Sequence, residues 1–253
     1  VDFIRASPIQ KIQIEKERRI LMSIAENVAE IRRRMASAAL AAGRDPKDIL
    51  LCAATKMNVA DAVRQAIAAG VDCCGENRVQ ELTAKLAQNA YDGAPLHFIG
   101  HLQTNKVKFL VGVVDLIESV DRLELLECIE KQAEKAGVVQ NILFEVNIGA
   151  EESKSGFTKE EAAALAARMR EFPHVALKGL MAIPPVSEFP GENCRYFAEM
   201  RNLFVDIKAK KYDNVSMECL SMGMSDDFTD AIAEGSTMVR IGTAIFGKRN
   251  YNV

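Results

Sequence analysis

Hydrophobic residues along this chain gather in short runs that alternate with stretches in which they recur every three or four positions. The clearest run covers residues 49–54, Ile-Leu-Leu-Cys-Ala-Ala, and is followed by Thr55 and then abruptly by Lys56. Turn-forming residues bound it, with Asp45-Pro46 before and Asn58 after. A short apolar run between turn signals is typical of a buried β-strand.

The same alternation continues to the end of the chain and predicts eight strands. We expect them near residues 49, 71, 96, 114, 141, 175, 216 and 238, the last extending over 238–246. Helices are expected between them, over residues 59–69, 76–88, 104–110, 121–136, 159–170, 193–210 and 226–233. Strands that alternate with helices form right-handed βαβ units and a parallel sheet. Eight units in 253 residues predict a single closed (β/α)₈ TIM barrel; an open doubly wound sheet is the alternative.

A long amphipathic helix is expected ahead of the first strand. Apolar residues recur at helical spacing over residues 17–42, and Gly43 ends the pattern. No linker or change in composition marks a second domain. We therefore expect an N-terminal extension over residues 1–21 and one barrel domain over residues 22–253.

Composition and charge narrow the class of protein. The chain is 49% hydrophobic and 26% charged with a formal net charge of −3, which is ordinary for a soluble globular protein and gives no basic surface for nucleic acid. It contains no apolar stretch of the roughly 18 residues that a membrane span requires, and its start does not resemble a signal peptide. Its six cysteines lack the spacing of a disulfide framework. These features predict a cytoplasmic protein.

Lys56 is the first candidate for chemistry. Active sites of barrels lie at the carboxyl ends of the strands, which is where Lys56 follows the first strand. Burial disfavours the charged form of a lysine, and the neutral amine attacks carbonyl groups. The alternative is an ordinary solvated surface lysine.

Two later segments favour a phosphate site. Gly223 and Ser225 form a turn before an expected helix, and helix N-termini bind phosphate through free N–H groups. Gly242-Thr243 follows the last strands, where barrels often bind phosphate. The alternative for Ser225 is that it only caps the helix.

Arg240 lies in an otherwise apolar strand, between Val239 and Ile241. A buried arginine needs a partner, so an inward Arg240 implies a ligand or a carboxylate; an outward structural salt bridge is the alternative. The chain has three histidines, His97, His101 and His174, and no set of ligands that specifies a metal site. We therefore expect no metal.

These segments together resemble those of a known family. They are Lys56, Gly75-Glu76-Asn77, the HFIGHLQTNK stretch of residues 97–106, the SMGMSD stretch of residues 221–226 and the VRIG stretch of residues 239–242. In combination they resemble the pyridoxal 5′-phosphate (PLP) homeostasis proteins, YggS-like in bacteria and PROSC-like in animals, over residues 22–251. The resemblance implies a fold type III barrel like the N-terminal domain of alanine racemase, with PLP as its cofactor.

The resemblance also implies where PLP is held. Lys56 matches the Schiff-base lysine that carries PLP as an internal aldimine. The family's phosphate-binding segments match Ser225, the Met224 backbone, Gly242 and Thr243.

Further roles follow from the same resemblance. Arg240 matches the residue that faces the pyridine nitrogen, Asn77 lies beside the cofactor, and Ser221 lines the same pocket. The sequence departs from many relatives at Met57-Asn58, where they have a threonine or lysine followed by proline. This departure affects the loop over the cofactor but leaves the lysine in place.

The role expected for Arg240 limits the chemistry. PLP is the strongest electron sink when its ring nitrogen is protonated, and a permanently charged arginine opposite that nitrogen disfavours protonation. We therefore expect a non-catalytic protein that stores, buffers or delivers PLP to PLP-dependent apoenzymes, maintaining vitamin B6 and amino-acid pools.

Two enzymatic functions are the alternatives to a non-catalytic protein. A PLP-dependent amino-acid racemase would need a second base from a β-rich domain, and the sequence ends shortly after Gly247. Without the contacts of that domain we expect a monomer. A Schiff-base aldolase barrel would carry its lysine on a later strand.

Overall fold

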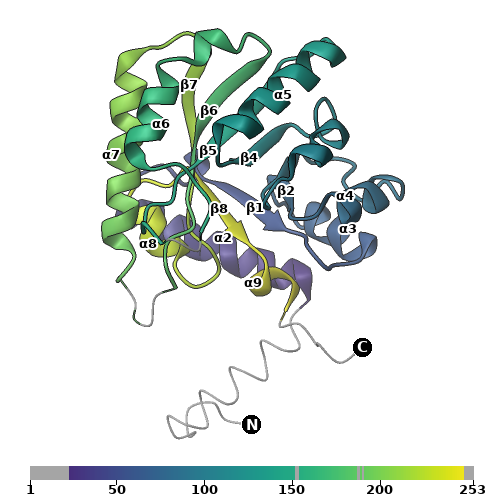
Figure 1. The fold of residues 1–253 in the computed structure, drawn as a ribbon. Helices are drawn as coiled ribbons and strands as arrows, with labels where there is room; N and C mark the ends of the chain where they lie inside the picture. The colour runs from purple at the N-terminus through teal and green to yellow at the C-terminus, as the bar shows by residue number, and fades with distance from the viewer. Residues whose placement is uncertain (1–22, 152–153, 187–188, 190, 248–253) are drawn as a thin grey trace, which may run out of the picture.

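The computed structural model describes residues 23–151, 154–186, 189 and 191–247. Its eight strands are all parallel and close into a barrel in the order β1 to β8, so the predicted (β/α)₈ barrel is confirmed (Figure 1). The strands are β1 (Leu50–Ala54), β2 (Cys73–Glu76), β3 (Leu96–Phe98), β4 (Leu116–Val120), β5 (Gln140–Glu145), β6 (Val175–Met181), β7 (Val215–Ser221) and β8 (Met238–Ile241).

Helices cover the outside of the barrel. The α-helices are α2 (Ile24–Ala41), α3 (Ala60–Ala68), α4 (Val79–Leu86), α5 (Leu123–Ala136), α6 (Lys159–Ala166), α7 (Cys194–Lys210), α8 (Phe228–Ala233) and α9 (Thr243–Phe246). Short 3₁₀ segments are η2 (Pro46–Asp48), η3 (Thr104–Phe109) and η4 (Met169–Glu171).

The helix predicted ahead of the first strand is present as α2. Ser23 caps it in a reciprocal capping box with Glu26, and its buried stripe includes Val28, Ile31 and Met35. This stripe packs against the C-terminal helices α8 and α9, which lie beside α2 in Figure 1. The predicted start at residue 17 and the extension over residues 1–21 lie outside the described residues, so this division stays a prediction.

The predicted last strand over residues 238–246 is wrong beyond Ile241. The chain turns at Gly242, whose carbonyl accepts the N–H groups of Ile245 and Phe246 and begins the short helix α9. Residues 244–246 are apolar because α9 packs on α2, where Asn27 Nδ2 donates to the Ile245 carbonyl at 2.9 Å. A short apolar run does not by itself separate a strand from a buried helix.

The bounds of several other elements differ from the prediction by a few residues. β4 begins at Leu116 rather than near 114, because turns that follow η3 extend to Val114 through hydrogen bonds to the Leu110 carbonyl. The helix expected over residues 226–233 begins at Phe228. The helix expected over residues 159–170 ends at Ala166, and η4 follows it.

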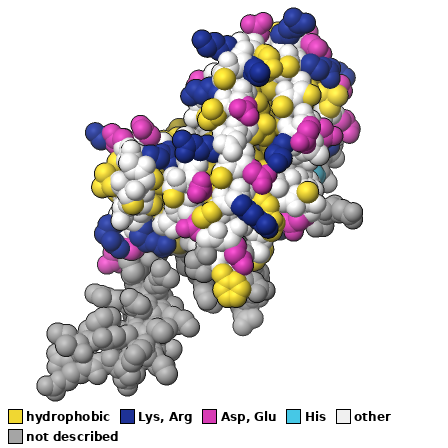
Figure 2. Space-filling view, turned by 90° about the vertical axis from the view of Figure 1, so that its left-hand side faces the viewer, with side chains coloured by type: hydrophobic (Ala, Val, Ile, Leu, Met, Phe, Trp, Pro, Cys, Tyr) yellow, Lys and Arg dark blue, Asp and Glu magenta, His cyan; other side chains and the backbone are white. Residues whose placement is uncertain are grey.

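A second cluster of buried apolar side chains is contributed by the strands. This cluster comprises Cys52, Cys73, Leu116, Leu143, Met181 and Met238. A larger core packs between the outer faces of the strands and the helices. On the face of the molecule seen in Figure 2, positive and negative side chains are interspersed. Among the described residues, no helix is long and apolar enough to cross a membrane.

Candidate functional site

Lys56 follows β1 after one intervening residue, Thr55, and is half-buried at the carboxyl-terminal mouth of the barrel. A tight turn fixes its backbone, because the Asn58 N–H donates to the Thr55 carbonyl at 3.1 Å. Met57, at the third position of this turn, has φ of +61°. A turn with positive φ at that position favours glycine or asparagine, so the residue after Lys56 is held in a conformation that its side chain disfavours.

Asn77 follows β2 and is held close to the end of β3. A Cβ atom on Gly100 would lie 2.2 Å from the Asn77 carbonyl oxygen, so only glycine allows this approach. The Asn77 side-chain oxygen Oδ1 is buried and has no hydrogen-bond partner among the described residues. Such an atom is costly to leave unpaired, which marks this position as one that a ligand can satisfy.

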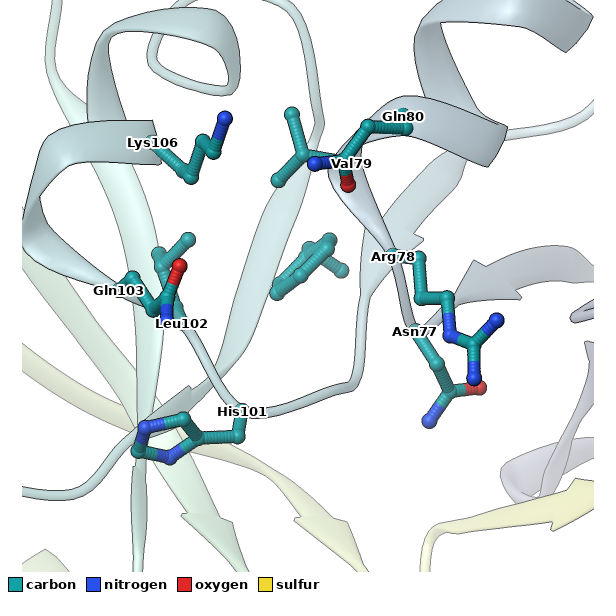
Figure 3. Close-up of a pocket in the computed structure, with 9 residues that line it drawn as sticks. Asn77, Arg78, Val79, Gln80, His101, Leu102, Gln103 and Lys106 are labelled. Carbon is teal, nitrogen blue, oxygen red and sulfur yellow. The ribbon is translucent and has the colours of Figure 1, made fainter.

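A cavity of about 160 Å³ opens beside Asn77 (Figure 3). Its walls come from the segment after β2 and from the segment after β3. The residues that line it are Asn77, Arg78, Val79, Gln80, Phe98, His101, Leu102, Gln103 and Lys106. In Figure 3, Lys106 and Gln103 lie across the cavity from Val79 and Gln80.

The structure brings the two predicted phosphate segments together. The Ala244 N–H donates to Ser225 Oγ at 3.4 Å, which joins the segment after β7 to the one after β8. Gly223 has φ of +95°, and a Cβ there would lie 2.6 Å from Ala231 Cβ. Gly242 packs beside Ala54, because a Cβ at Gly242 would lie 3.4 Å from the Ala54 Cβ. This joined segment therefore reaches the strand that carries Lys56.

Asp227, rather than Ser225, occupies the N-cap position of α8. The alternative in which Ser225 only caps this helix is therefore wrong. Asp227 Oδ1 accepts the N–H of Met224 at 2.7 Å, so this backbone donor, predicted to bind phosphate, is already engaged by a carboxylate. Met224 itself is exposed.

Arg240 is buried inside the barrel, and both terminal nitrogens of its guanidinium donate hydrogen bonds. Its Nη1 donates to Ser221 Oγ at 2.5 Å and its Nη2 to the Ala182 carbonyl at 2.9 Å. Glu118 Oε2 lies 4.0 Å from Nη1 and accepts a hydrogen bond from Ser221 Oγ at 2.6 Å. An inward Arg240 was predicted to have a ligand or a carboxylate as its partner; the structure shows the carboxylate, and the outward alternative is wrong.

Glu118 was not predicted as a site residue, although it joins two polar groups inside the barrel. It is fully buried, and its Oε1 lies 2.8 Å from His97 Nδ1. Burial acts to raise the pKa of Glu118, but the hydrogen bond and charge of His97, with Arg240 and Ser221, hold that pKa below its ordinary value. A single glutamate in an apolar strand was the signal for it.

Glu145, at the end of β5, was also missed. Burial raises the pKa of Glu145 to about 7, and the nearby Asp121 acts in the same direction, while Arg240 opposes them. A carboxyl group whose pKa lies near neutral pH is a candidate for proton transfer.

The fold and these segments define the class of protein. The sequence profile of the family described as alanine racemase, N-terminal domain, matches residues 21–250. Solved alanine racemases show the same fold: that of Streptomyces coelicolor superposes with a TM-score of 0.67 at 19% identity, over 90% of this chain and 59% of its own.

Curated relatives with higher sequence identity identify the family more closely. The pyridoxal phosphate homeostasis protein of Pseudomonas aeruginosa is 42% identical over 91% of this chain and 98% of its own length. The pyridoxal phosphate homeostasis protein of Escherichia coli K12 is 41% identical over 90% of this chain and 98% of its own length. The chain therefore belongs to the pyridoxal phosphate homeostasis protein family, as its motifs predicted.

Solved structures agree with this assignment. An unknown protein from Bifidobacterium adolescentis has a TM-score of 0.83 at 39% identity, covering 88% of this chain and 94% of its own. PipY of Synechococcus elongatus, solved with PLP bound, has a TM-score of 0.76 at 31% identity. The match covers 89% of this chain and 100% of the PipY chain.

Proposed function

We propose that this protein binds PLP at the carboxyl-terminal mouth of its barrel and stores, buffers or delivers it. The observation that carries the proposal is that the segment joined by Ser225 and Ala244 lies, at Gly242, against Ala54, the last residue of the strand that leads into Lys56. An amine and a phosphate-binding segment on the same mouth match the two ends of PLP. The names of the curated relatives and the PLP-bound PipY structure support the same ligand.

The residues at this mouth fit the cofactor. Lys56 would hold the aldehyde end covalently through Nζ. The phosphate would lie against Ser225, Gly242 and Thr243, with Met224 contributing its N–H once Asp227 releases it. Asn77, with its unpaired buried Oδ1, would contact the ring edge.

Arg240 and Ser221 would hold the nitrogen end of the ring. Bound PLP withdraws electrons most strongly from an attached amine when that nitrogen is protonated. Arg240 is permanently charged and has hydrogen-bond donors but no acceptor. Because its neighbours Ser221, Ala182 and Glu118 fix it in place, it cannot turn away to admit a protonated ring. We therefore propose a carrier rather than a catalyst.

Racemisation is the second candidate, and Glu145 is the observation that favours it. A carboxyl group with a pKa of about 7 could exchange a proton with a bound amino acid at neutral pH. Racemisation needs such a group on each face of the substrate, and Arg240 opposes the ring protonation that would assist it.

PLP titration tests the proposal directly. Wild-type protein is expected to show the visible absorption band of lysine-bound PLP, and Lys56→Ala is expected to lose it. Lys131→Ala, on the exposed face of α5, is the control and should keep the band. A wild type without the band would contradict the proposal.

Two assays separate a carrier from a racemase. Holoprotein is expected to restore activity to a PLP-dependent apoenzyme, and to racemise alanine or serine no faster than free PLP. Racemisation well above that level would favour the enzyme, and Glu145→Gln should then abolish it.

The proposal extends to the setting in which delivery takes place. A carrier must meet its apoenzymes, so we propose a cytoplasmic protein that presents the open mouth of its barrel to them as a monomer. The solved alanine racemases extend beyond the part that matches this chain, which covers 58% of the Clostridium difficile enzyme. Light scattering of the holoprotein measures the oligomeric state.

A further inference from the structure

An ion pair is buried directly beside the turn that carries Lys56. Lys85 on α4 contacts Glu76 Oε1 at the end of β2, and the two side chains are only 8% and 0% exposed. Removing two charges from water costs more than their attraction returns unless further hydrogen bonds satisfy them. The groups that form these further hydrogen bonds with Lys85 and Glu76 therefore indicate which segment the ion pair holds in place.

Those partners belong to Thr55, the residue before Lys56. Lys85 Nζ donates to the Thr55 carbonyl at 2.7 Å, and Thr55 Oγ1 donates to Glu76 Oε1 at 2.7 Å. β1, β2 and α4 thus meet in one buried cluster. The peptide group that joins Thr55 to Lys56 therefore accepts a hydrogen bond from the buried ammonium of Lys85.

The residue after Lys56 is held from the same helix. The N–H of Met57 donates to Glu81 Oε2 at 2.6 Å, and the same oxygen lies 3.8 Å from Lys85 Nζ. This contact restrains Met57 in its left-handed conformation, which a residue with a side chain disfavours. Both peptide groups that flank Lys56 therefore depend on α4.

We propose that Lys85 is a positioning residue for Lys56. Its buried ammonium fixes Thr55 directly and Met57 through Glu81, so that the Lys56 amine starts from one backbone geometry at the barrel mouth. The same helix begins just after Asn77, so α4 ties the lysine turn to the segment beside the proposed cofactor site. This inference rests on the proposed function, in which Lys56 holds PLP.

Lys85→Met tests it, because methionine keeps much of the length of the side chain and removes the charge. We expect the dissociation constant for PLP to rise about tenfold, which corresponds to about 1.4 kcal/mol. In the cofactor-free protein, the amides of Met57 and Asn58 should exchange with solvent faster than in wild type. The control is Ile207→Ala, a buried position on α7 that should lower thermal stability without changing PLP affinity.

Each outcome decides the question. A Lys85→Met protein that loses stability yet keeps wild-type PLP affinity and Met57 exchange would show a purely structural ion pair. If Lys85→Met does not fold, Glu81→Ala replaces it, since Glu81 is 22% exposed and contacts the same turn. That variant should show weaker PLP binding and faster Met57 exchange, and wild-type values would overturn the inference. Failure of the proposed function is seen separately, as a wild type that forms no visible band.

Discussion

Arg240 and Ser221, on neighbouring strands, are joined by a hydrogen bond of 2.5 Å from Nη1 to Oγ inside the barrel. Ser221 in turn donates to Glu118, whose other oxygen faces His97. A guanidinium, a hydroxyl, a carboxylate and an imidazole thus form one chain across the barrel interior. Glu118 and His97 therefore support Arg240 through Ser221, the member of this chain that also belongs to the proposed cofactor site.

Removing Glu118 should destabilise the fold strongly. Glu118→Ala leaves the buried Arg240 without a carboxylate, and breaking a buried pair in this way costs about 3–5 kcal/mol. Glu118→Gln keeps the shape and should cost less. Urea unfolding at neutral pH measures both. A loss from Glu118→Ala of the size typical of surface substitutions would show that Arg240 does not depend on Glu118.

The same carboxylate predicts an acid-dependent loss of stability. The pKa of Glu118 is lowered in the folded protein, so its contribution is complete above the ordinary value of 4.5 and is lost as pH falls below it toward the folded value. Wild type should therefore lose stability faster than Glu118→Gln below pH 4.5. Parallel curves for the two proteins over that range would contradict this assignment.

Glu145 predicts the opposite pH dependence. Its pKa rises from 4.5 in ordinary surroundings to about 7 in the folded protein, so the unfolded chain loses its proton first as pH rises. Stability should fall between these values by up to about 3 kcal/mol and then level off. Glu145→Gln should remove this fall and be more stable than wild type above pH 7. Unfolding curves across that range, without PLP, measure the difference.

Met57 offers a test of backbone strain beside Lys56. Its φ is +61° and its side chain is 55% exposed, so replacing it removes little packing. Met57→Gly should raise the free energy of unfolding by about 0.5–1 kcal/mol. Glycine removes the cost of the left-handed conformation, and the greater entropy of glycine in the unfolded chain offsets part of that gain. Met57→Ala keeps the Cβ and is the matched control, which should show no gain. Equal stability of the glycine and alanine variants would show that the turn is not strained.

The sequence predicted the barrel because its signal is local and repeated. Each strand is an apolar run with both faces buried, and each helix has its own periodicity, so β1 and α2 were both foreseen. The helix α9 was not, because its apolar residues face α2, far away in the sequence. Nothing within residues 243–246 distinguishes that packing from a strand.

The site was predictable where the chemistry of one residue stands out. Lys56 and Arg240 break apolar runs, and the structure places them at the mouth and in the interior of the barrel. Glu118 and Glu145 break apolar runs as well, but their importance depends on which side chains face them across the barrel. That information lies in the register between strands, which for example pairs Glu145 with Met181 and Met181 with Ser221, and no single segment contains it.

Gly100 connects the fold to the proposed cofactor site, and its substitution should affect both. Gly100→Ala places a Cβ 2.2 Å from the Asn77 carbonyl, so the segment that carries Asn77 must move away from β3. Such overpacking typically costs about 1–3 kcal/mol, and because Asn77 moves with it, PLP binding should weaken as well. Gly43→Ala is the matched control: Gly43 has a left-handed φ of +68° with nothing within 4 Å of an added Cβ, so it should lose some stability and keep PLP affinity. Absorbance titration with PLP, beside urea unfolding of each variant, separates the two effects. Wild-type affinity in Gly100→Ala would mean that Asn77 lies too far from the cofactor to matter.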